Sequence, residues 1–537
     1  MENLPTKVSD YLDFLLPGLS RKRTPLAWPP DVFGVVASLL LRSGAYRVAA
    51  IDWPPANKKS RWVPYIEKIG EKWRESYQAG APIEVRRWWQ EMIQNKALDI
   101  RDLGKHRSLC QALLQLLAAA DEASEGAGVP SRTEEFDSFD FVARTTLHRN
   151  NGATLCEQLA NGSIRVLPKM HVPQSGLTIR SFSKHLALIV GSEIAPKWFT
   201  LGSSKPAEEL NLLLIPWPPK IHETAFKAVK PGKCVMKNLP RQFGFFEFER
   251  DNKKGFTKSL IEIFQTAEES VGPIDAVILP ESSITDTEFE ELNSILLSQG
   301  VYLIAGVNGP RNADGTLGNC VRYNIPLAGY EVPVRQAKHH RWKIDGAQIR
   351  NYRLEKQLNP KRNWWEHIPI EDRTLNFVAF RPWLAMCALI CEDLARPDPV
   401  GDIIRAIGPN LVIALLLDGP QIPERWSARY ATALTDDPGC SVLTLTSKGM
   451  AKLSRPRYKR GYKENAETIA SWKDIRGSTL RIDLKGGEAA VLGIKIDRRE
   501  EWTADGRDCG KQVGYPLLHW VHLLANGKVL RRFDLRE

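Results

Sequence analysis

The chain has 537 residues, a formal net charge of +11 and eight cysteines. A single hydrophobic core rarely grows beyond roughly 250–300 residues, so this length predicts two or more domains. No apolar run approaches the ~18 residues of a membrane span, and the first residues lack the basic and apolar parts of a secretory signal. Cysteines spread this thinly, with no CxxC pair, do not indicate a disulfide framework. We therefore expect a cytoplasmic protein with reduced thiols and no membrane contact.

Residues 1–204 have a mainly helical pattern. Apolar residues recur at helical spacing over 109–123, and 65–78 is amphipathic. The acid-rich stretch near 121–140 contains Gly and Ser and predicts an exposed loop or a linker. No motif in this region can be attached to a reaction. Its role is open, with recruitment of a protein partner as one hypothesis, because the 16 tryptophans of the chain offer large contact surfaces.

The pattern changes at about residue 205. Short apolar runs bounded by Gly, Pro, Asn and Asp now recur, and helical patterns such as 257–270 and 287–300 lie between them. Strands that alternate with helices predict an α/β domain with largely buried sheets.

Three of these extended segments end in residues that are costly to bury. Glu281 follows DAVILP, Cys391 follows MCALI, and Lys338 follows the segment that ends in RQA. Taken alone, each has a plainer interpretation: a buried thiol such as Cys387, a solvated carboxylate, or surface charge. Together they supply what thiol catalysis needs, namely a thiol whose pKa neighbouring groups lower, a carboxylate that moves the proton, and a cation for the developing oxyanion.

The motifs LPESSI, KHH and LICEDL, in this order, resemble the Glu, Lys and Cys of the nitrilase, or carbon–nitrogen hydrolase, superfamily. The resemblance covers roughly 205–537 and implies a four-layer αββα sandwich, preceded here by the mainly α-helical region. It implies Glu281 as general base, Lys338 as oxyanion stabiliser and Cys391 as the nucleophile that forms a thioester. The CEDL motif is also similar to the glutaminase domains of glutamine-dependent NAD synthetases. No nucleotide-binding loop accompanies it, so only the amidase half is implied.

The resemblance also implies which residues contact the substrate. Asn319 corresponds to an Asn near the start of a strand in that family, and Glu392 directly follows the nucleophile. Gln348 stands near the place where many members have a second Glu, about ten residues after the Lys. Lys343 is close enough in sequence to compete with Lys338 for the catalytic role. We expect no metal and no cofactor.

These observations predict a hydrolase of a small amide, or alternatively of a nitrile, that assembles as a homo-oligomer. The alternative is a nitrilase-like domain without activity that serves as a scaffold or effector subunit. The segment 165–181 is similar to a region that precedes nitrilase domains in bacterial phage-defence proteins associated with reverse transcriptases, and it implies such a complex. The basic loop 447–463 is either a solvated loop or a patch that contacts nucleic acid, because it interleaves Lys and Arg with two Tyr.

Overall fold

Over the residues that it describes, the computed structural model shows helices and four β-sheets, which confirms the predicted mixed α/β class. It describes residues 5–49, 51, 53–54, 61–130, 137–159, 162–173, 176–191, 193–201, 208–236, 238–250, 255–327, 330–369, 371–454, 466–508 and 513–535.

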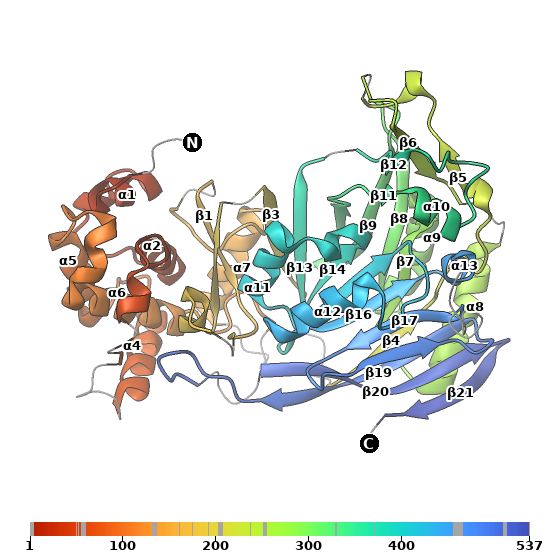
Figure 1. The fold of residues 1–537 in the computed structure, drawn as a ribbon. Coiled ribbons are helices and arrows are strands. Elements are labelled where there is room, and N and C mark those ends of the chain that lie inside the picture. The colour runs from red at the N-terminus through yellow and green to blue at the C-terminus, as the bar shows by residue number, and fades with distance from the viewer. Residues whose placement is uncertain are drawn as a thin grey trace.

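The first part of the chain is a set of helices, several of which pack around α6 (Figure 1). They are α1 (Val8–Leu15), α2 (Pro29–Ser43), α3 (Ala45–Ala49), α4 (Trp62–Ser76), α5 (Ile83–Gln94), α6 (Arg107–Glu122) and α7 (Ser138–Arg149). Helix α2 begins with two prolines, which its first turn tolerates because the backbone N–H groups there have no partner within the helix. It is capped by Gly44, whose φ is 67°. Four tryptophans are almost fully buried here: Trp28, Trp62, Trp73 and Trp89.

Strands begin after α7, still within the first 204 residues. Strand β1 (Ile164–Pro168) pairs antiparallel with β2 (Leu186–Val190). Strand β3 (Ile194–Thr200) pairs in parallel with β13 (Arg373–Arg381) at the edge of a large sheet. This sheet therefore includes a strand that precedes residue 205.

One large sheet has eight strands, in the order β10-β9-β8-β7-β4-β19-β20-β21. Their bounds are β4 (Glu209–Leu214), β7 (Ala276–Thr285), β8 (Tyr302–Arg311), β9 (Leu317–Leu327), β10 (Tyr330–Ala337), β19 (Ala489–Arg499), β20 (Val513–Ala525) and β21 (Lys528–Asp534). Strands β4, β7 and β8 are parallel, and the remaining pairs are antiparallel. Glu281 lies in β7, and Lys338 directly follows β10.

The second large sheet has seven strands, in the order β18-β17-β16-β15-β14-β13-β3. Besides β3 and β13 they are β14 (Leu384–Ile390), β15 (Leu411–Leu416), β16 (Ser441–Thr446), β17 (Thr468–Lys473) and β18 (Thr479–Asp483). Every residue of β14 and β15 is buried, as expected for parallel strands covered on both faces. Cys391 directly follows β14.

The two large sheets share the largest hydrophobic core, to which Leu212 and Ile278 contribute from one sheet and Leu389 and Leu415 from the other. A second core joins α8 and α9 to the opposite face of the eight-stranded sheet. Helix α12 lies against β16 and β17. The helices of this part are α8 (Phe256–Val271), α9 (Asp286–Leu297), α10 (Gly346–Asn351), α11 (Asp402–Ile407), α12 (Trp426–Asp436) and α13 (Lys448–Leu453).

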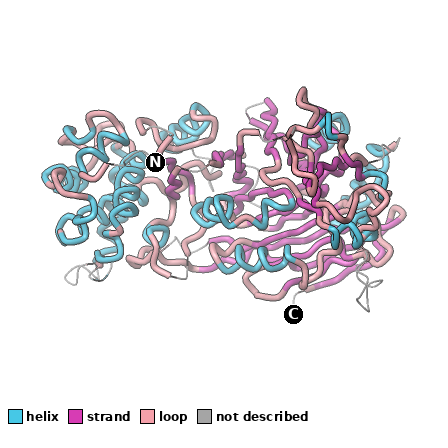
Figure 2. The backbone as a smooth tube through the Cα atoms, turned by 45° about the horizontal axis from the view of Figure 1, so that its top comes forward, coloured by secondary structure: helices cyan, strands magenta, loops and turns pink. Residues whose placement is uncertain are grey.

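A small four-stranded sheet, in the order β11-β12-β6-β5, stands away from the long C-terminal strands (Figures 1 and 2). Its strands are β5 (Phe226–Ala228), β6 (Phe243–Phe248), β11 (Lys343–Ile344) and β12 (Asn363–Glu366). Strand β12 ends in a carboxylate that belongs to the site described below.

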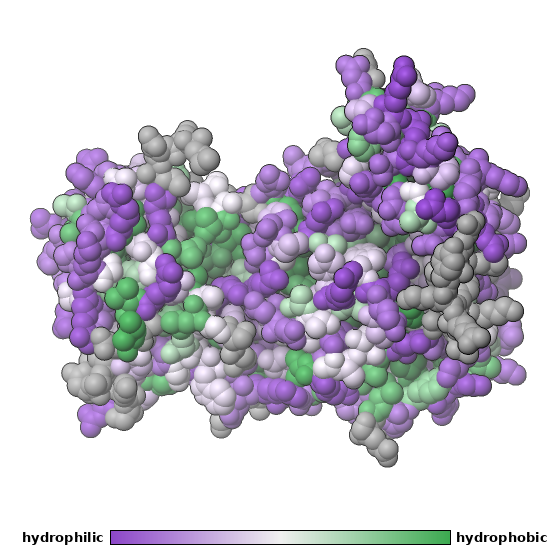
Figure 3. Space-filling model, viewed as in Figure 1, coloured by the Kyte–Doolittle hydropathy of each residue, from purple (hydrophilic) through white to green (hydrophobic). Residues whose placement is uncertain are grey.

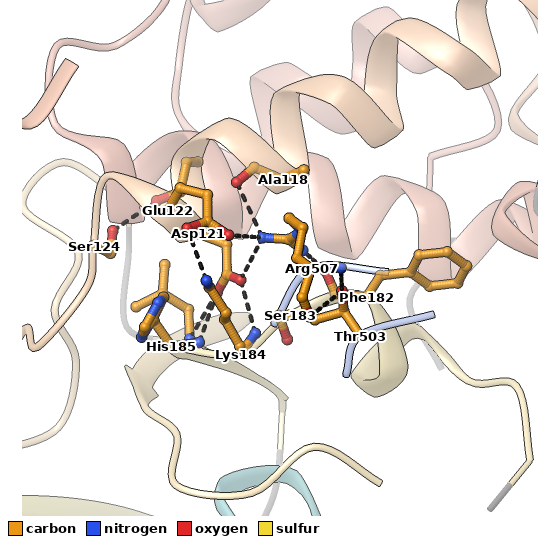
Figure 4. Close-up of polar contacts among 12 residues, drawn as sticks. Ala118, Asp121, Glu122, Ser124, Phe182, Ser183, Lys184, His185, Thr503 and Arg507 are labelled. Atoms are coloured by element: carbon orange, nitrogen blue, oxygen red, sulfur yellow. Dashed lines mark hydrogen bonds and ion pairs between the residues drawn. The ribbon is translucent and has the colours of Figure 1, made fainter. Parts of the chain in front are cut away.

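A buried ion-pair network joins the helical part to the segment between β19 and β20 (Figure 4). The guanidinium of Arg507 donates to Asp121 over 3.0 Å and to Glu122 over 2.7 Å, both at the end of α6. Its Nε lies 3.1 Å from Asp505, and Lys184 Nζ lies 3.0 Å from Glu122. All five side chains are buried. The network therefore ties three distant segments of the chain together.

The start of the acid-rich stretch 121–140 is thus not the exposed loop expected from the sequence. Its first two carboxylates are buried because they neutralise a guanidinium that has no exposed surface. Composition alone could not show this, because their partner lies some 385 residues later in the chain. Residues 131–136 lie outside the described residues.

The face in Figure 3 is mostly hydrophilic, with hydrophobic areas where the helical part meets the sheets. Across the described ranges, no helix combines the length and apolarity needed to cross a bilayer. In the basic segment 447–463, Lys448 and Lys452 lie on α13, and 455–465 fall outside the described residues. Contact with nucleic acid through this loop stays a prediction.

Candidate active site

The structure brings the predicted glutamate and lysine into direct contact. Lys338 Nζ lies 2.7 Å from Glu281 Oε1, and both residues are at most 4% exposed. The other oxygen of Glu281 accepts the backbone N–H of Leu417, which follows β15, over 2.7 Å. The charges of Glu281 and Lys338 both act on the thiol of Cys391, which is 2% exposed. A residue within β7 and the residues that follow β10 and β14 therefore come together between the two large sheets.

A second carboxylate, from Glu366, completes the contacts of the lysine. Glu366 Oε2 lies 2.6 Å from Lys338 Nζ and accepts the backbone N–H of Trp342 over 3.1 Å. Asn319 Nδ2 donates to Glu281 and to Glu366, at 2.8 Å in each case. Asn319, expected to contact substrate, thus links the two carboxylates, and its Oδ1 has no partner among the described residues.

Sequence reasoning missed Glu366 because it lies 28 residues after Lys338, beyond α10 and the β11–β12 pair. Gln348, expected near this position, lies elsewhere: it forms a capping box with Asp345 at the start of α10. A helix-start signal, Asp followed three residues later by Gln, was present in the sequence and explains this placement. The signal for Glu366 was a lone carboxylate that ends the aromatic strand NWWE.

Lys343 does not compete with Lys338. It is exposed in the short strand β11, where its ammonium lies 5.7 Å from the ring centre of Trp365. The lysine that faces the carboxylates is therefore the one directly after β10.

Cys391 stands at a sharp turn between β14 and a short 3₁₀ segment, 391–395. Its φ of 44° lies in the left-handed region, which non-glycine residues rarely adopt and which costs on the order of 1–3 kcal/mol. Such strain persists where the surroundings hold the backbone, and it is common at functional sites. Because of this turn, the side chain of Cys391 does not continue the alternation of side chains between the two faces of β14.

Asp393 connects the Cys391 segment to the Lys338 segment. Its buried carboxylate accepts the backbone N–H groups of His339 and His340 at 3.0–3.1 Å, and the His340 ring nitrogen lies 3.1 Å away. Because His339 directly follows Lys338 and Asp393 lies two residues after Cys391, these hydrogen bonds fix the backbone at Lys338 relative to the backbone at Cys391.

Burial and neighbouring charges together shift the pKa values of the groups in the site. It raises the pKa of Glu281, an effect that Lys338 opposes and Glu366 reinforces. Burial alone would lower the pKa of Lys338, but Glu281, Glu366 and the Cys391 thiol together raise it well above its ordinary value. The lysine is therefore an ammonium shared between two carboxylates.

The pKa of Cys391 moves against the sequence expectation. Burial and the charge of Glu281 raise it well above the usual value for a thiol, and Lys338 only partly opposes them. The resting group is therefore a neutral thiol, and its reaction needs a base within the site. Glu281 is a buried carboxylate whose charge acts on this thiol.

Glu392, expected to contact substrate, is half-buried beside the nucleophile. Burial raises the pKa of its carboxyl, and Arg396 lies 3.6 Å from it. Its contact with a substrate stays a prediction.

Comparison with known proteins gives no family model and no curated protein that matches the chain. Similar solved structures include Saccharomyces cerevisiae Nit3, a member of branch 10 of the nitrilase superfamily (12% identity, TM-score 0.32, covering 55% of this chain and 92% of that one). Another is the C. elegans NitFhit protein (12% identity, TM-score 0.34, covering 53% of this chain and 61% of that one). A third is a carbon–nitrogen hydrolase from Helicobacter pylori (10% identity, TM-score 0.27, covering 51% of this chain and 86% of that one). These neighbours are nitrilase-superfamily members matched over part of the chain at low identity. The side chains of the site carry the function proposed below.

Proposed function

We propose that this chain hydrolyses a non-peptide carbon–nitrogen bond of a small amide through a thioester on Cys391. The observation that carries the proposal is Lys338, held as a buried ammonium between Glu281 and Glu366 beside a strained, buried thiol. This arrangement contains a nucleophile, a base and an oxyanion donor in one place. A structural ion pair alone would not need the strained cysteine.

In the first half of the reaction, Cys391 Sγ attacks the amide carbon while Glu281 takes the thiol proton. Lys338 donates a hydrogen bond to the oxygen that becomes negative. The tetrahedral intermediate collapses, the carbon–nitrogen bond breaks, and the proton on Glu281 passes to the leaving nitrogen. The products of this half are an amine or ammonia and the thioester.

In the second half, Glu281 takes a proton from water, and the oxygen of that water attacks the thioester carbon. Lys338 again stabilises the oxyanion. The carbon–sulfur bond breaks, the thiol regains its proton from Glu281, and a carboxylic acid leaves. The sum is amide plus water giving acid plus amine. The role of Glu366 is to keep Lys338 charged and in place throughout.

The fold that this proposal assigns to the chain is the four-layer αββα sandwich. Support comes from the core shared by the two large sheets and from the helices that pack on them. Within the first 204 residues, the helices α1–α7 would form a region with a partner-binding role, whereas β3 belongs to the seven-stranded sheet. Gln348, which stands near the place where many family members have a second Glu, would favour an inactive scaffold. Glu366 supports the hydrolase instead, because it supplies a second carboxylate at Lys338.

The test is to trap the thioester. The purified chain is incubated with a panel of primary and N-substituted amides, and with nitriles, followed by acid quench and peptide mass spectrometry. We expect an acyl mass on the peptide that contains Cys391, and ammonia or amine in solution. Cys391→Ala should lose both signals, whereas Cys387→Ala, a matched change of a buried thiol four residues earlier, should keep them. Turnover that survives in Cys391→Ala would overturn the mechanism.

A further inference from the structure

A cavity of about 250 Å³ lies between the two large sheets, apart from the candidate active site. Its inner wall comes from the first halves of several strands: Leu210 in β4, Ile304 in β8, Met386 in β14 and Ile413 in β15. These residues belong to the core shared by both sheets. The cavity is therefore a space inside the sandwich, with an apolar inner end.

The cavity and the candidate catalytic residues lie at different levels along the same two strands, β7 and β14. Ala276 lines the cavity five residues before Glu281, and Met386 lines it five residues before Cys391. At about 3.3 Å per residue, the two places are roughly 16 Å apart along each strand. The cavity is thus not an extension of the substrate site.

The mouth of the cavity combines two aromatic rings with an ion pair. Tyr302 and Phe380, both half-buried, meet edge to face with ring centres 5.0 Å apart. Beside them, Arg381 Nη2 lies 2.7 Å from Asp275 Oδ1. These two charges neutralise one another, and the lining also includes the carboxylate of Glu268. The mouth therefore offers polar atoms and aromatic surface but no surplus positive charge for an anionic ligand.

We propose that this cavity binds a small uncharged aromatic molecule of one or two rings with a single polar group. An apolar cavity of roughly 150 Å³ is known to stay dry and take up benzene, so this larger space accommodates a bigger ring system. The apolar end receives the rings, the aromatic pair contacts their faces and edges, and the polar group lies at the Asp275–Arg381 mouth. The proposal does not depend on the hydrolase function.

Indole is the probe, and its binding to the full chain is measured by isothermal titration calorimetry. We expect saturable one-site binding to the wild type and to Cys391→Ala, because the active site is not involved. Indole-3-acetate, which adds a negative charge, should bind at least about tenfold more weakly, because burying an unpaired charge is costly. Equal or tighter binding of the anion would overturn the proposed ligand class.

Ala276→Leu places extra carbons inside the cavity and should weaken indole binding at least about tenfold. Ala347→Leu, the same change on the exposed surface of α10, is the matched control and should bind as the wild type does. If Ala276→Leu does not fold, the binding site is located instead by hydrogen exchange of the wild type with and without indole. Indole should then protect residues 302–304 and 411–413 selectively. No saturable binding, or protection elsewhere only, would overturn the site.

Discussion

Replacing Arg507 by Met should strongly destabilise the junction between the helical part and the C-terminal strands. The guanidinium is completely buried and contacts Asp121, Glu122 and Asp505 at 2.7–3.1 Å, with a further bond to the Phe182 carbonyl at 2.5 Å. Met has a comparable length but no charge. The substitution therefore leaves buried carboxylates without their cation.

The size of the effect follows from what remains around those carboxylates. Removing one partner of a buried ion pair costs about 3–5 kcal/mol. Asp121 keeps three backbone N–H donors at 2.7–3.0 Å, and Glu122 keeps Lys184. We therefore expect a loss near the lower end, about 3 kcal/mol, or roughly 10²-fold in the unfolding equilibrium.

Urea unfolding followed by far-ultraviolet circular dichroism measures the loss, and hydrogen exchange locates it. The amides at the end of α6 should exchange faster in Arg507→Met. Arg498→Met is the control, because Arg498 pairs with the exposed Glu208 at 2.8 Å, and surface pairs contribute only about 0–1 kcal/mol. Equal destabilisation by both substitutions would refute the claim that the buried network holds the two parts together.

Lys338→Ala should reduce the rate of amide hydrolysis roughly 10²–10³-fold through loss of the oxyanion donor, whereas Lys343→Ala should leave the rate unchanged. The reverse pattern would show that Lys343, and not Lys338, is the catalytic lysine. Glu366→Gln should lower kcat roughly 10²-fold through misplacement of the lysine. It should also move the acidic limb of the pH profile to lower pH, since loss of a negative neighbour lowers the pKa of Glu281; a shift upward would contradict this. Asp393→Asn should lower kcat with little change in KM. An unchanged kcat would exclude the positioning of Lys338 by the Asp393 hydrogen bonds. Light scattering of the full chain should give a homo-oligomer, and a monodisperse monomer at micromolar concentration would exclude it.

The α/β class and the meeting of a glutamate with a lysine could be predicted because both depend on local pattern. Apolar runs between turn residues specify buried strands, and chemically costly residues at their ends mark where side chains converge. Glu281 and Lys338 were found in this way, and the structure brings them together at 2.7 Å.

The other features of the fold and the site could not be predicted, because they depend on contacts between residues far apart in the sequence. Glu366 reaches Lys338 only because the chain returns through α10 and the β11–β12 pair before it enters the site. The carboxylates of Asp121 and Glu122 are buried because Arg507 lies opposite them, although their own neighbourhood reads as an exposed loop. The direction of the Cys391 pKa was missed for a related reason: neighbouring charges could be inferred, but the burial that outweighs them could not.

The charges of the site explain why a raised thiol pKa is compatible with catalysis. A buried thiolate beside Glu281 and Glu366 would add a third negative charge to one ammonium, so the resting state keeps the proton on sulfur. In the proposed mechanism, negative charge leaves the sulfur as it attacks a carbonyl carbon and develops on the carbonyl oxygen, to which Lys338 would donate a hydrogen bond. The proton would then reside on Glu281, whose own pKa is raised by burial. Under this proposal, negative charge would form on the reacting atoms only when a substrate is present to receive it.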